Sequence, residues 1–213
     1  DEYWRQFYRP QENLVVGLKG QVSFKNCISL TANMATSAFT ADTESQKVTT
    51  GEAARFDKIF EPRYTSRVRF AGDAALNFSF SWLNASIFYK IIKPDYVSLG
   101  TYYTSNNYHS LGVNLGTTLF RRVSLSASFS GQADNLAKQQ LYTTKGYVYN
   151  GMASWRLGNN FNVSAMYNGF LQKQGDGTAA VNDTTEVKRV LHSISLLPTY
   201  NLPGEKLDHT ISL

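Results

Sequence analysis

The chain has 213 residues, of which only 17% are charged, and 21 basic against 16 acidic side chains give a net charge of +5. No run of about 18 to 20 apolar residues occurs, which argues against a transmembrane helix. The basic residues are dispersed and form no stripe with interleaved aromatics, so nucleic acid is not an expected partner. The one cysteine, Cys27, excludes an internal disulfide.

Apolar and polar residues alternate with a period of two over about ten segments, the pattern of β-strands that have one apolar face. In VSLSASFS, residues 123–130, apolar residues take every odd position and serine every even one. The segments fall into hairpins, which we predict to pair as 14–24 with 27–39, 66–82 with 85–93, 109–120 with 123–130, 146–156 with 161–171, and 190–202 with 207–213.

Short turns within the hairpins alternate with long polar stretches between them, at about 40–65, 94–108, 132–144 and 172–188. Greek-key sandwiches mix loop lengths at both ends of their strands, whereas transmembrane barrels have short periplasmic turns and long extracellular loops. Hydrocarbon cannot satisfy free backbone groups, so a spanning sheet must close on itself. We therefore predict an all-β fold, in which residues 1–213 are part of one antiparallel transmembrane β-barrel domain and the long stretches are extracellular loops.

The predicted strand directions place both ends of the chain on the extracellular side. A complete bacterial barrel has an even number of strands and both termini in the periplasm. An odd number of strands would then be missing from each end. We therefore expect about ten strands in this segment and at least twelve in the intact protein.

Charged side chains on the polar register are the candidate lining of the lumen: Lys19, Arg67, Arg69, Asp73, Lys90 and Arg156. With Asp208, five basic minus two acidic side chains leave a surplus of three positive charges. A water-filled pore with this lining would favour anions. The same residues could instead form internal salt bridges in a filled barrel.

Aromatic residues near the inferred strand ends fit the girdles at the two membrane interfaces: Trp82, Tyr147, Trp155, Tyr167 and Tyr200. The alternative is that they are core residues of a soluble sheet.

The histidines His109, His192 and His209 are each followed by Ser or Thr, the residue types of a hydrolytic pair. Neighbours on a strand point to opposite faces, so these pairs cannot act together, and we assign no catalytic residue. One cysteine and scattered histidines offer no zinc spacing, so neither a metal nor another cofactor is expected.

Residues 89–136 contain the motifs PDYVSLGTYY, LFRRVSLSASFS and QADNL. Together they resemble outer-membrane β-barrels of the Bacteroidetes type, and the style of repeating hairpins extends this resemblance over most of the chain. The resemblance implies a Gram-negative outer membrane and contact with its lipids. Such barrels serve as free-standing channels, as TonB-linked uptake proteins and as accessory subunits of secretion or protein-insertion machines. Neither a plug domain nor a TonB box is recognisable here, which disfavours the uptake proteins.

Three functions follow as hypotheses. The first is a non-enzymatic accessory or structural subunit of an outer-membrane complex for secretion or protein assembly, with other barrels or lipoproteins as partners. The second is a porin-like diffusion channel for small solutes, anions among them. The third is a surface adhesin that uses the loop 40–65.

Overall fold

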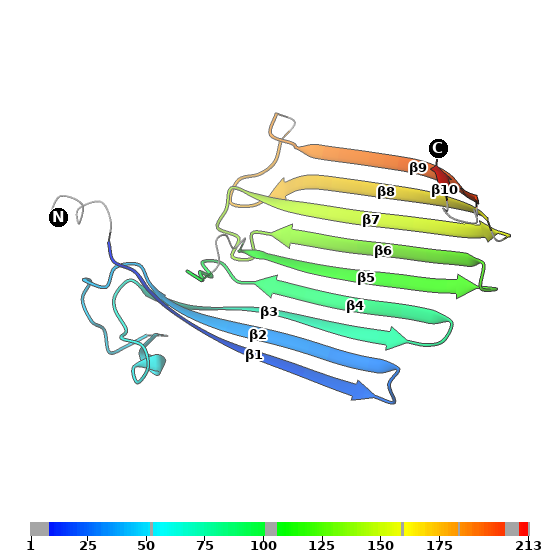
Figure 1. Cartoon of the computed structure of the whole chain (residues 1–213). Coiled ribbons are helices and arrows are strands. Elements are labelled where there is room, and N and C mark those ends of the chain that lie inside the picture. Colours follow the sequence, from blue (N-terminus) through cyan, green and yellow to red (C-terminus); the bar gives the residue numbers. More distant parts are fainter. Residues whose placement is uncertain are drawn as a thin grey trace.

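The computed structural model describes residues 9–51, 53–100, 106–158, 160–182, 184–202 and 209–212. They form one antiparallel sheet in which every strand pairs with its neighbour in sequence (Figure 1). The strands are β1 (Glu12–Phe24), β2 (Ile28–Thr40), β3 (Ser66–Ser79), β4 (Leu83–Ile92), β5 (Tyr108–Leu119), β6 (Val123–Asp134), β7 (Tyr142–Leu157), β8 (Phe161–Asp176), β9 (Lys188–Leu202) and β10 (His209–Ser212). The predicted all-β antiparallel class is confirmed.

The sheet is open in the described residues, because β1 pairs with β2 and β10 pairs with β9 but no pairing joins β1 to β10. A 3-10 turn, η1 (Ala53–Phe56), lies in the connection between β2 and β3. No helix among the described residues is long and apolar enough to cross a membrane.

Tight turns join the strands at one end of the sheet and long loops join them at the other, as the right and left sides of Figure 1 show. Lys25 and Asn26 have φ angles of 48° and 56°, and Phe120 and Arg121 have 51° and 57°. Two successive residues in the left-handed region define a type I′ turn, whose twist matches that of the flanking strands. These turns therefore fix the register of β1 on β2 and of β5 on β6.

Several strands extend beyond the alternating segments. β7 begins at Tyr142 rather than at 146, and β8 continues to Asp176 rather than ending at 171. The turn between β3 and β4 also lies earlier than expected, with the Phe80 amide donating to the Leu83 carbonyl at 2.8 Å. The added residues are mostly polar and pair through their backbones, which leaves no apolar alternation to reveal them.

The register between consecutive strands from β1 to β9 runs without interruption, so it sorts side chains into two faces. We call the apolar face the one that carries Leu18, Leu30, Leu76, Ile87, Leu115, Leu125 and Ile194, and the polar face the opposite one. The apolar and polar residues of the predicted alternation thus occupy opposite faces of one sheet. Large side chains on the apolar face are open to the surroundings, since Leu18 is 76% and Ile194 79% exposed.

Few apolar side chains are buried in the described part of the chain: Ala38, Ala53, Phe60, Ile92 and Tyr96. Soluble monomers rarely expose a contiguous apolar patch larger than a few hundred Å². The apolar face therefore requires an apolar covering.

Candidate functional site

The polar face contains a row of serine and asparagine side chains that crosses nine consecutive strands. Strand pairing aligns, in order, Ser23, Ser29, Asn77, Ser86, Asn114, Ser128, Asn150, Asn168 and Ser193. We call this set the Ser/Asn row. Small neutral polar groups at every strand give this level of the face an uncharged, hydrogen-bonding surface.

Hydrogen bonds connect members of the Ser/Asn row across neighbouring strands. The side-chain amide of Asn114 donates to the Ser86 hydroxyl at 3.0 Å, and that of Asn150 donates to Ser128 at 3.0 Å. The side-chain amide of Asn77 likewise donates to the Ser29 hydroxyl at 3.4 Å. Each of these bonds joins two strands that are connected by a long loop, so the side chains cross-link strands that no tight turn holds together.

A second row, nearer the long loops, carries charge. It aligns Lys19, Asn33, Asp73, Lys90, Ser110, Gln132, Gly146, Gln172 and Arg189. The Asn33 amide donates to the Asp73 carboxylate at 2.8 Å. The Lys90 ammonium lies 5.8 Å from the centre of the Tyr108 ring, within cation–π range. This charged row presents both signs on β1 to β4.

Six of the seven predicted lumen residues lie on the polar face. Lys19, Asp73 and Lys90 share the charged row, whereas Arg67 and Arg69 lie closer to the long loops. Arg156 lies far from them, beside the tight turn that joins β7 to β8 and opposite Asn162. Asp208 is outside the described residues.

The segment Asp95–Leu99, between β4 and β5, folds back across the polar face; we call it the strap. The Asn13 side chain on β1 donates to the Val97 carbonyl at 3.4 Å and accepts from the Leu99 amide at 3.0 Å. The Ser37 hydroxyl on β2 also donates to the Val97 carbonyl and is 1% exposed. Sequence reasoning missed the strap, because nothing local in residues 95–99 indicates partners on β1 and β2.

An ion pair holds the start of the strap, with Arg67 Nη1 3.2 Å from Asp95 Oδ2. Between the strap's anchors on β1 and β2 and the charged row, Gly17, Ala35 and Ala71 align as a strip of small residues. Their small size leaves a hollow of about 340 Å³ that Lys19, Asn33, Asp73 and Lys90 help to line. The strap and this hollow together shape the loop end of the polar face.

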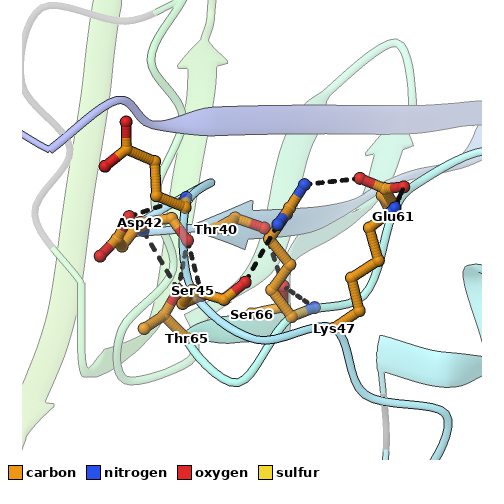
Figure 2. Close-up of polar contacts among 9 residues, drawn as sticks. Thr40, Asp42, Ser45, Lys47, Glu61, Thr65 and Ser66 are labelled. Carbon is orange, nitrogen blue, oxygen red and sulfur yellow. Dashed lines mark hydrogen bonds and ion pairs between the residues drawn. The ribbon is translucent and has the colours of Figure 1, made fainter.

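The loop 41–65 is held by its own polar network, which Figure 2 shows. The Arg63 guanidinium donates to the Ser45 carbonyl at 3.0 Å and to Glu61 at 2.6 Å. Lys47 also donates to Glu61. This hydrogen bond, together with the charges of Lys47 and Arg63, lowers the pKa of Glu61 from its usual value of 4.5. Beneath this network, Thr40 is fully buried and bonds to Ser66 at 2.8 Å.

The predicted interface aromatics occupy different heights of the sheet. Trp82, Trp155 and Tyr200 lie at the tight-turn end, and Tyr147 lies toward the long loops. Tyr167 is near the middle of β8, where its hydroxyl is 2.8 Å from His192 Nδ1 and the two rings stack with centroids 6.0 Å apart.

His192 shares the apolar face with Tyr167, whereas Ser193 lies in the Ser/Asn row on the opposite face. His109 is likewise on the apolar face, and the side chain of His209 is outside the described part. The described residues contain no cluster of three or more His, Cys, Asp or Glu side chains that could hold a metal ion.

Comparison with protein-family models and with curated proteins gives no match for this chain.

Proposed function

We propose that this sheet is part of the wall of a transmembrane β-barrel in a bacterial outer membrane. The observation that carries the proposal is the separation of the two faces: one continuous side is apolar and exposed, and the other bears the polar rows. Lipid would cover the first face, and the second would line the lumen. Hydrocarbon cannot satisfy free backbone groups, so the outer edges of β1 and β10 would be paired in the closed barrel.

The height of the apolar face supports this placement. On β7, Lys145 and Trp155 mark its two limits and are ten residue steps apart. At about 3.4 Å per residue and a tilt of about 45°, this distance corresponds to roughly 24 Å along the membrane normal. The apolar band of outer-membrane barrels is about 25 Å tall.

Within that wall we propose a non-enzymatic accessory or structural role in an outer-membrane complex, with other barrels or lipoproteins as partners. The strap supports this role over free diffusion, because it covers part of the polar face at β1 and β2. The prediction is stable association with such partners and little conductance of the isolated barrel in planar bilayers. Large, steady conductance without partners would contradict it.

Site-directed labelling tests the membrane placement. In a Cys27→Ser background, Leu18→Cys and Ile194→Cys sample the apolar face, and Asn114→Cys and Ser128→Cys sample the polar face. We expect a membrane-impermeant thiol reagent to modify the second pair and to spare the first. Fluorophores on the first pair should instead be quenched by nitroxide-labelled lipids. Equal reactivity of both pairs with the reagent would refute a lipid-covered apolar face.

A porin-like channel for small anions is the second candidate. It is favoured by the lysines and arginines of the polar face on β1, β3 and β4. Asp73 is the carboxylate that opposes them on those strands, and Asp95 pairs with Arg67. Fixed positive charge along a narrow water-filled path raises the local concentration of anions. Under this proposal the strap narrows the path without blocking it.

A further inference from the structure

We propose that the membrane-facing surface of β7, β8 and β9 binds a lipid with a phosphate-bearing headgroup, in the leaflet on the side of the long loops. The inference rests on the proposed membrane placement. Its central observation is one aligned row of lysines, Lys145, Lys173 and Lys188, on three neighbouring strands. We call this set the lysine row.

The lysine row belongs to the register of the apolar face. On β7, Lys145 is separated by an even number of positions from Tyr147 and Trp155, and strand pairing places Lys173 and Lys188 beside it. The next row toward the tight turns is Tyr147, Leu171 and Val190. The ammonium groups therefore border the apolar face at its loop end, at the level expected for lipid headgroups.

Within the described residues, the lysine row has fewer paired carboxylates than ammonium groups. Its three lysines are exposed, and the ion pair formed there joins Lys173 to Glu186 at 3.9 Å. Three ammonium groups against one carboxylate leave a surplus of two positive charges. Like charges directly opposite each other on paired strands destabilise a sheet, since their Cβ atoms are only about 5 Å apart. An external anion bound across the strands would relieve this repulsion.

Apolar surface for acyl chains adjoins the lysine row on the same face. It begins with Tyr147, Leu171 and Val190, of which Val190 is 50% exposed. Cationic headgroup contacts and an adjoining apolar surface on one face match an anionic lipid, whereas a free phosphate ion would use only the lysine row.

The experiment compares the protein with a variant that carries Lys145→Gln, Lys173→Gln and Lys188→Gln. Both are reconstituted into phosphatidylcholine vesicles that contain a minor fraction of phosphatidic acid or, in matched vesicles, of uncharged diacylglycerol. Native mass spectrometry of the extracted protein counts the retained lipids. Each lysine near an anionic surface contributes roughly a fivefold factor in affinity. We expect retention of phosphatidic acid to fall roughly tenfold to a hundredfold in the variant.

The matched control carries Lys25→Gln, Lys58→Gln and Lys138→Gln, which remove the same charge from a tight turn and two loops. It should retain phosphatidic acid like the parent protein.

The outcomes separate the two proposals. If the protein fails to float with the vesicles, both the membrane placement and the lipid site are wrong. If it floats but retains both lipids equally, or if the lysine row can be neutralised without loss, the lipid site alone is wrong. Displacement of phosphatidic acid by an equal concentration of inorganic phosphate would also overturn it, because the acyl chains would then contribute nothing.

Discussion

Gly112 on β5 lies beneath the ring of Phe88 on the polar face, and a methyl group there would also approach the Phe129 carbonyl at 3.0 Å. Gly112→Ala should therefore displace the ring and destabilise the sheet by about 1 to 3 kcal/mol. Gly116, on the same strand, has open space around it. Gly116→Ala should be neutral or slightly stabilising. Guanidinium titration in detergent micelles measures both, and equal effects would contradict the close packing of Phe88.

Glu61 gives the loop 41–65 a pH dependence. Its pKa is below the usual 4.5 because Lys47 donates to it and the charges of Lys47 and Arg63 favour the carboxylate. A lowered pKa in the folded state means that this stabilisation is complete above pH 4.5 and is lost as the pH falls through the folded value. Amide exchange of residues 41–65, corrected for intrinsic rates, should accelerate in that acidic range. In Glu61→Gln the acceleration should be smaller, and an unchanged profile would exclude Glu61 as its source.

At the scale of the elements, the strap depends on Asn13. Asn13→Ala removes the bonds to the Val97 carbonyl and from the Leu99 amide. A net contribution of about 1 kcal/mol per hydrogen bond predicts amide exchange at Leu99 faster by roughly tenfold or more. Asn150→Ala, which removes a bond within the Ser/Asn row, should leave Leu99 unaffected. Equal exchange in Asn13→Ala and the parent would show that other contacts hold the strap.

Sequence periodicity predicted the strands well and the folding of the loops poorly. Alternation in residues 123–130 reflects one apolar and one polar face of the strand, so β6 was predictable from its own residues. Lys173 and Lys188 fell within a predicted loop, since polar extensions of β8 and β9 interrupt the apolar alternation. The lysine row and the strap also depend on register and on partners far away in the sequence. No single segment carries that information.

For the whole molecule, the proposed channel predicts a dependence of ion selectivity on the polar face. Lys90→Glu reverses a charge in the charged row, whereas Lys93→Glu makes the same change on a side chain that lies over the Phe70 ring. In planar bilayers, Lys90→Glu should lower the permeability of anions relative to cations, because it removes positive charge from the path. Lys93→Glu is the control, because Lys93 lies outside the charged row, and it should leave the ion selectivity unchanged. Identical selectivity in the two variants would argue against a conducting path along this face.

The candidate lumen residues could be assigned to one face from sequence because a strict period of two needs no knowledge of partners. Their grouping could not be assigned from sequence, because Lys19, Asp73 and Lys90 come together only through the register of four strands. The separation of Arg156 from that group has the same origin. Alternation therefore predicts which face of the sheet a residue occupies. Strand pairing determines its position between the tight turns and the long loops.

The strap has a consequence for the order in which the protein is built. Every strand adds to its immediate predecessor, so hairpins can join one after another through short-range contacts. The hydrogen bond from Leu99 to Asn13 instead spans 86 residues. It can close only after β1 to β4 are in place, and it then ties the fourth strand's exit back to the first. A chain arrested during assembly before residue 99 would lack this latch, and strand pairing alone would hold its first four strands together.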